Sequence, residues 1–133
     1  MIFDERDRKA TVALRRALVA RGIEVHAPVF EGDAAEVRLA NEQRLIQCDA
    51  VLVFYGSGTE AWKDSVDSDL RKAAARRSGR PLRAVFTWLA EPANAAKADA
   101  IDMGGPNVID GQRGFSEALV EPVVKALLGT GHA

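Results

Sequence analysis

Short apolar, β-branched runs alternate along the chain with longer segments in which apolar residues recur every three or four positions. The short runs predict strands at residues 23–27, 50–55, 82–89 and 107–110. The second and third runs are almost entirely apolar, which is typical of parallel strands covered by helices on both faces. Only residues 1–3 are available for an opening strand, so we expect a short first strand, either truncated or cut from a longer protein. Restoring upstream residues should then raise the melting temperature.

The longer segments predict amphipathic helices between the strands. Their apolar stripes are Ala10, Leu14, Ala17 and Leu18; Val37, Asn41, Leu45 and Cys48; Trp62, Val66, Leu70, Ala73 and Ala74; and Phe115, Leu119, Val123 and Leu127. Asp33 is placed to cap the second helix and Ser78-Gly79 to end the third, and residues 95–101 predict one more short helix. Helices that alternate with strands imply right-handed crossovers, so the predicted fold class is α/β with a doubly wound parallel sheet.

Length, composition and charge narrow the function classes. With 133 residues, of which 47% are hydrophobic and 28% charged, the chain fits one folded domain over residues 1–128 and a polar tail at 129–133. A formal net charge of -1 argues against nucleic acid as a partner. The single cysteine, Cys48, excludes an internal disulfide, and with only two histidines no metal site is expected. No apolar stretch approaches ~20 residues, so we expect a cytoplasmic protein without membrane contact.

Ligands of open α/β sheets bind beyond the carboxyl ends of the strands, which places the candidate contacts in the loops that follow them. On that ground we expect ligand contacts from Asp4, Arg6, Tyr55, Ser57 and Trp62. Gly56-Ser57-Gly58 has too few glycines for a dinucleotide fingerprint and lacks the Lys-Ser/Thr pair of a P-loop, so it predicts a strand-to-helix turn. A phosphorelay receiver would need an aspartate where Tyr55 stands.

The third helix carries the residues that could perform chemistry. At about 100° of rotation per residue, Asp69 returns to nearly the same side of the helix as Trp62. Tryptophan can stack on a flat heterocycle, and a carboxylate beside it can stabilise the transition state of N-glycosidic cleavage. The same pattern also fits a charged helix surface on which Trp62 covers the edge of the core. A solvated face likewise accounts for the basic residues Arg71, Lys72, Arg76, Arg77, Arg80 and Arg83.

Residues 40–56, followed by Ala61-Trp62 and Asp69-Leu70, resemble a TIR (Toll/interleukin-1 receptor) domain of the divergent bacterial kind. The resemblance extends from Phe3 to about Leu128. It implies a flavodoxin-like three-layer α/β sandwich whose five-stranded parallel sheet has the order 2-1-3-4-5. It also implies an intracellular signalling or defence domain that associates with other TIR-like domains and forms a module of a larger protein, whose other domains are further partners.

The resemblance also assigns roles to residues. The family's self-association loop falls on Pro28, Phe30, Glu31, Gly32 and Asp33. Many members hydrolyse the nicotinamide-ribose bond of NAD with a glutamate four residues after the tryptophan, where this chain has Val66. If Asp69-Leu70 is taken as the family's Glu-Leu pair, with an insertion and the shorter Asp in place of Glu, the resemblance implies Asp69 as the candidate catalytic carboxylate, with NAD as substrate and no resident cofactor. A more distant resemblance, through residues 49–51 and 58–60, is to the nucleoside 2-deoxyribosyltransferases.

Overall fold

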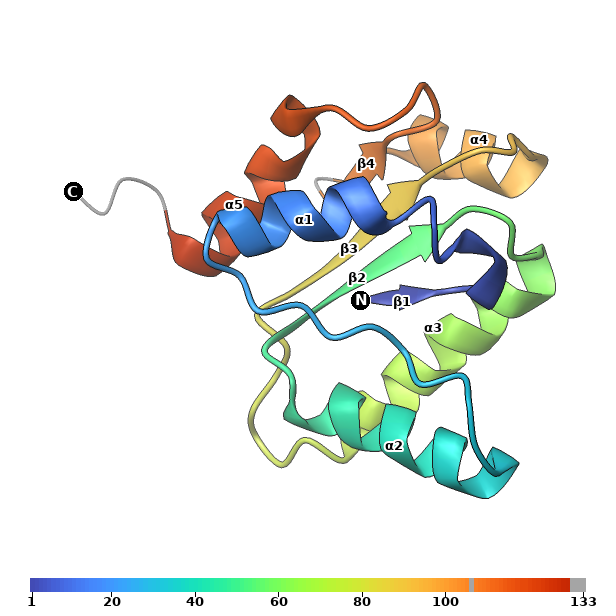
Figure 1. The fold of residues 1–133 in the computed structure, drawn as a ribbon, viewed down its shortest axis with the longest axis vertical. Coiled ribbons are helices and arrows are strands. Elements are labelled where there is room, and N and C mark those ends of the chain that lie inside the picture. The colour runs from blue at the N-terminus through green and yellow to red at the C-terminus, as the bar shows by residue number, and fades with distance from the viewer. Residues whose placement is uncertain (106, 130–133) are drawn as a thin grey trace.

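The sheet contains four parallel strands in the computed structural model, which describes residues 1–105 and 107–129. The strands are β1 (Ile2–Phe3), β2 (Ala50–Tyr55), β3 (Ala84–Leu89) and β4 (Val108–Asp110), and they lie side by side in that order (Figure 1). β2 and β3 pair residue for residue along their whole lengths. Because β1 and β4 also pair in parallel, the carboxyl ends of all four strands meet at one edge of the sheet.

Five α-helices among the described residues surround this sheet. α1 (Val12–Ala20) and α5 (Glu121–Leu128) lie on one face, whereas α2 (Ala34–Gln47) and α3 (Glu60–Ala75) lie on the other (Figure 1). α4 (Ala95–Met103) contacts β4, and two 3₁₀ turns are η1 (Glu5–Asp7) and η2 (Glu117–Val120). The α/β class is therefore confirmed, and the arrangement is compatible with a flavodoxin-like fold. None of the helices in the described part of the chain is long and apolar enough to cross a membrane.

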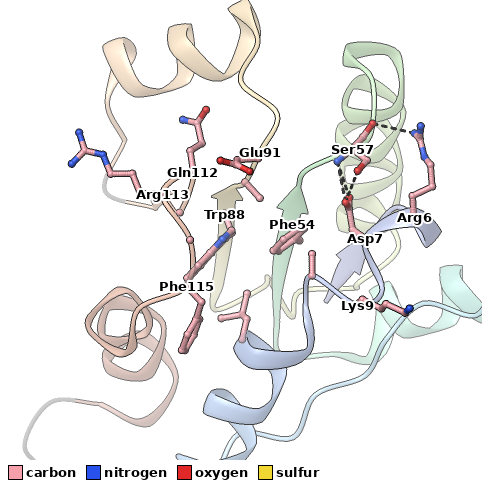
Figure 2. A pocket seen from close by; sticks show the side chains of 15 residues that line it. Arg6, Asp7, Lys9, Phe54, Ser57, Trp88, Glu91, Gln112, Arg113 and Phe115 are labelled. Atoms are coloured by element: carbon pink, nitrogen blue, oxygen red, sulfur yellow. Dashed lines mark hydrogen bonds between the residues drawn. The ribbon is translucent and has the colours of Figure 1, made fainter.

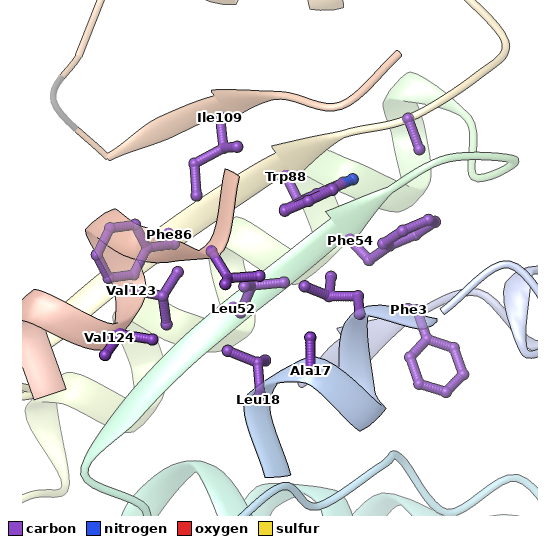
Figure 3. Close-up of a cluster of buried hydrophobic side chains, with 13 residues drawn as sticks. Phe3, Ala17, Leu18, Leu52, Phe54, Phe86, Trp88, Ile109, Val123 and Val124 are labelled. Atoms are coloured by element: carbon purple, nitrogen blue, oxygen red, sulfur yellow. The ribbon is translucent and has the colours of Figure 1, made fainter. Parts of the chain in front are cut away.

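The two faces of the sheet bury cores of different size. Alternate residues of a strand point to opposite faces, so Leu52 and Phe54 of β2 point toward α1 and α5, whereas Val51 and Val53 point toward α2 and α3. The first face carries the larger core, in which aromatic side chains from three strands meet the helices (Figure 3). Among the described residues, the buried members of the second core are the two valines of β2 and Val66 of α3. The apolar run at 50–55 thus reflects burial on both faces.

The strand expected at residues 23–27 does not form, so the predicted fifth strand and the order 2-1-3-4-5 are not seen in the described residues. The segment passes beside β1, where the backbone nitrogen of Met1 donates to the carbonyl of His26 at 2.9 Å. β1 itself has only two residues, and its ladder to β2 joins Ile2 to Val53 and Phe3 to Phe54. Such a short strand offers too few backbone groups to hold a second neighbour in regular pairing.

Most predicted helices form close to their expected bounds. Asp33 caps α2 as predicted, since its carboxylate accepts from the Ala35 nitrogen at 3.2 Å. The predicted stop at Ser78-Gly79 is confirmed by two residues with positive φ, 47° and 79°, just beyond the end of α3. The last helix begins later than its apolar stripe predicts. Pro122 has no N–H to donate, so α5 starts at Glu121 and Phe115 lies in the preceding loop.

Candidate functional site

The loops at the carboxyl ends of the strands enclose a cavity of about 530 Å³, which we call the rim cleft. It is lined by Arg6, Asp7, Lys9, Ala10, Leu14, Phe54, Ser57, Trp88, Ala90, Glu91, Gly111, Gln112, Arg113, Gly114 and Phe115. Phe54 and Trp88 are 3% and 2% exposed and form its floor, while charged side chains stand around it (Figure 2). An apolar floor with a few polar groups at the margin is the usual composition of a small-molecule site.

Asp7 fixes one wall of the rim cleft. Its side chain is only 4% exposed, and its carboxylate accepts from the backbone nitrogen of Ser57 at 2.9 Å and from the Ser57 hydroxyl at 2.7 Å (Figure 2). Gly56 permits this approach, because a Cβ there would lie 2.9 Å from both carboxylate oxygens of Asp7. The carboxylate therefore pins the turn between β2 and α3 to η1, and the predicted strand-to-helix turn at Gly56 is confirmed.

Asp4 and Arg6, two predicted ligand contacts, are paired with each other. The Arg6 guanidinium lies 3.0 Å from Asp4, and it donates a further bond to the carbonyl of Ser57 at 3.0 Å. The hydrogen bond from Arg6 lowers the pKa of the Asp4 carboxyl below its ordinary value. Arg6 and Ser57 line the rim cleft, so the structure brings these predicted residues together at the expected edge.

Tyr55 points to the opposite face of the sheet, and it lies beneath a buried lysine. Lys97 of α4 is fully buried, with its ammonium 4.7 Å from the centre of the Tyr55 ring. The ammonium donates to the carbonyls of Gly56 and Ala90, at 2.8 and 2.9 Å, and to that of Pro92. Burial lowers the pKa of Lys97 below its ordinary value, an effect that the nearby Asp7 carboxylate opposes. Lys97 thus ties together the loops that follow β2 and β3.

Trp62 and Asp69 line a different hollow of about 920 Å³, which extends from α2 and α3 past β1 and residues 22–30 to α5. We call it the α2/α3 groove. The Trp62 ring packs 6.2 Å from the ring of Tyr55 and against Gly58, where a Cβ would lie 2.5 Å from the indole. Asp69 is exposed, and at a rise of 1.5 Å per residue it lies about 13 Å along α3 from Glu60. The two residues share a groove, but neither lines the rim cleft.

The segment predicted for self-association is anchored at both ends. The side-chain amide of Asn41 accepts from the Val29 nitrogen at 2.9 Å and donates to the Val29 carbonyl at 3.1 Å. Phe30 is half-buried, with its ring 5.6 Å from that of Phe3 and the Arg8 guanidinium 5.5 Å from its centre. Asp33 closes the segment as the cap of α2. Between the anchors, Glu31 and Gly32 are exposed, and Gly32 takes a φ of 125°.

One predicted member of the solvated basic face is buried instead. Arg77 is 5% exposed, and its guanidinium donates to the carbonyls of Leu45 and Ile46 at 2.9 and 2.8 Å and to that of Arg80 at 2.7 Å. The last carbonyls of a helix lack partners within the helix, so a cation that reaches them satisfies those groups. Arg77 therefore joins the end of α3 to the end of α2.

Sequence reasoning missed the side chains that give the rim cleft its character, namely Lys9, Trp88, Glu91, Gln112 and Arg113. Their loops are identifiable as rim segments, but no motif indicates which side chains turn inward. Among the described residues, no group of three or more histidine, cysteine, aspartate or glutamate side chains is arranged to hold a metal ion. Comparisons with protein-family models, with curated proteins and with solved structures found no match to this chain.

Proposed function

We propose that this chain is a TIR-like signalling or defence module that acts by homotypic association through residues 28–33. The observation that carries the proposal is the contrast within that segment, in which an exposed tip stands between fixed ends. Val29 is held by the Asn41 amide, and Asp33 caps α2. Glu31 and Gly32 project between them. A loop that is already ordered loses less conformational freedom on binding, which favours association.

The chain also carries a surface of opposite charge that could receive the tip. Arg71 and Lys72 lie exposed on the second half of α3, and within the described part of the chain neither has an ion-pair partner. Glu31 of one copy and this end of α3 of another would make a head-to-tail contact. Such heterologous contacts generate rings or open filaments rather than closed dimers. This geometry fits a module whose signal depends on assembly.

Sedimentation velocity of concentrated protein tests the association. We expect Glu31→Lys to lower the sedimentation coefficient of the assembled species, and Arg71→Glu combined with Glu31→Lys to restore it by exchanging the charges. Asp102→Lys is the matched control, because Asp102 is an exposed acid on α4 and its change in charge is identical. Identical profiles for Glu31→Lys, Asp102→Lys and the unaltered chain would refute the role of this segment.

A second function, hydrolysis of NAD at the nicotinamide-ribose bond, is supported by the placement of Trp62 and Asp69 in one groove. In this mechanism the Trp62 ring would hold the nicotinamide, and the Asp69 carboxylate would stabilise positive charge on the ribose. Nicotinamide release by the unaltered chain should disappear in Asp69→Asn. Asp64→Asn removes an exposed carboxylate from the same helix and should leave release unchanged. Equal release by the Asp69 variant and the unaltered chain would exclude this carboxylate from the reaction.

A further inference from the structure

We propose that the rim cleft binds a small molecule that joins an anionic group, of the phosphate type, to a flat ring. This site is separate from the segment at 28–33 and from the α2/α3 groove, so it does not depend on either function proposed above. Three features carry the inference: an unpaired donor in the floor, unpaired cations at the margin and an exposed aromatic ring.

The donor is the indole N–H of Trp88. This side chain is 2% exposed, yet no acceptor among the described residues pairs with its nitrogen. All fully buried side-chain nitrogen and oxygen atoms of the described residues have partners, so the unpaired nitrogen of Trp88 must open to the cleft. Buried indole N–H groups normally find an acceptor. An oxygen atom of a bound molecule would supply it.

Gly111 lies against the indole of Trp88 and leaves its N–H without a covering side chain at this position. A Cβ at position 111 would overlap the indole of Trp88, so the backbone of the loop after β4 can lie directly against the ring only because the residue is glycine. The Gly111 nitrogen is bonded to the carbonyl of Leu89 at 2.8 Å, which fixes the loop in this position. The indole N–H of Trp88 therefore lies beside a loop that a backbone hydrogen bond holds in place.

The margin of the cleft has more positive charge than its carboxylates neutralise. Lys9 and Arg113 stand on opposite sides of the cleft, and neither side chain has a hydrogen-bond or ion-pair partner within residues 1–105 and 107–129 (Figure 2). The charged lining residues are three cations, Arg6, Lys9 and Arg113, and two carboxylates, Asp7 and Glu91. Charge complementarity therefore favours an anion, and phosphate accepts bonds from both lysine and arginine.

Phe115 provides a surface for a flat ring. It lies nearly parallel to Trp88, with an angle of 18° between the rings and 6.3 Å between their centres, and it is 39% exposed. An aromatic ring of a ligand could cover the exposed part of Phe115 while its anionic group lies between Lys9 and Arg113. The cavity of about 530 Å³ is within the range of sites that take small metabolites.

Nuclear magnetic resonance of the full chain tests this site directly, because its two tryptophans give two separate indole N–H signals. We would titrate ¹⁵N-labelled protein with adenosine monophosphate, ribose 5-phosphate, adenosine and inorganic phosphate. Adenosine monophosphate should shift the Trp88 signal in a saturable manner and leave the Trp62 signal in place. Ribose 5-phosphate and adenosine should each bind more weakly than the complete nucleotide, since each lacks one of the two recognised groups.

Charge variants separate specific binding from general attraction. Arg113→Gln and Lys9→Gln should each weaken the binding of adenosine monophosphate by about tenfold, the effect of losing one charge-assisted hydrogen bond. Arg38→Gln, which removes an exposed arginine from α2, should leave binding unchanged. The proposal is overturned if no probe moves the Trp88 signal at millimolar concentration, or if both tryptophan signals move together. Equal weakening by Arg38→Gln would also overturn it.

Discussion

The rim cleft and the α2/α3 groove differ in how rigidly hydrogen bonds and packing hold their walls. The cleft lies over the larger core, and its walls are fixed by Asp7 on one side and by Lys97 on the other. The groove is lined by residues of both cores, and the segment at residues 23–27 beside it forms no strand. Binding sites gain affinity when their groups are held before the ligand arrives. By that measure the cleft is the better organised of the two hollows.

The positions of Trp62 and Asp69 show that residues on one helix face can lie far apart along the helix axis. Trp62 and Asp69 lie on one side of α3, as the rotation of about 100° per residue predicts. That rotation says nothing about distance along the axis, and α3 carries Asp69 away from the carboxyl edge of the sheet as it descends. Two residues can thus share a helix face while only one of them lies near the loops that bind ligands.

Removal of Lys97 should have the largest effect on the rim cleft. We expect Lys97→Met to lower the free energy of unfolding by about 3 kcal/mol, because three carbonyls lose a charged donor within a buried site. Lys72→Met removes an exposed lysine from α3 and should change the stability by less than about 0.5 kcal/mol. Urea denaturation of the three proteins measures both. Equal stabilities of the two variants would contradict the role assigned to Lys97.

A methyl group added at Gly111 should displace the Trp88 indole, which forms the floor of the rim cleft, or the loop that lies against it. We expect Gly111→Ala to cost about 2 kcal/mol, because its Cβ would overlap the Trp88 indole and force the loop or the ring to move. Gly105→Ala is the matched control, since the nearest described atom to a Cβ there belongs to Val108, at an ordinary 3.7 Å. Thermal unfolding gives the stabilities, and the indole N–H signal of Trp88 reports the displacement. An unmoved signal in Gly111→Ala would show that the loop lies elsewhere.

The pH dependence of stability should reveal the buried lysine. The folded-state pKa of Lys97 lies below its ordinary value of 10.5, so between these two values the unfolded chain binds more protons than the folded chain. Stability conferred by this group therefore rises as the pH rises through that window toward 10.5, and it is constant below the folded-state pKa. The stability difference between the unaltered chain and Lys97→Met should grow accordingly. A difference that stays flat from neutral pH to pH 10.5 would contradict this.

The smallest effect on the free energy of unfolding is expected for a substitution of Asp69 in the α2/α3 groove. Asp69→Asn should change the free energy of unfolding by less than about 0.5 kcal/mol, because the carboxylate is exposed and no ion pair involves it within the described residues. Urea denaturation beside Asp7→Asn sharpens the comparison, since Asp7 is buried and bonded to Ser57. A loss of stability in Asp69→Asn as large as that in Asp7→Asn would mean that the groove is as firmly constructed as the cleft.

Local patterns predicted much of the fold. The continuous apolar run at 50–55 predicted a strand buried on both faces, and Asp33 predicted the start of α2, because each depends on neighbours within a few residues. The alternating run at 23–27 also predicts a strand, but whether it pairs depends on the neighbouring β1, which has only two residues. The rim segments were identifiable for a similar reason, since the carboxyl ends of parallel strands meet at one edge.

The sequence by itself determined the alternation of strands and helices, the parallel sheet and the edge at which ligands would bind. Only the tertiary structure decided which side chains occupy that edge. Asp7 meets Ser57 across fifty positions, and Lys97 reaches Gly56 across forty-one. Trp88 and Gly111 come together only because β3 and β4 are neighbours. Periodicity records which way a residue faces on its own element, whereas contacts of this kind depend on how distant elements pack.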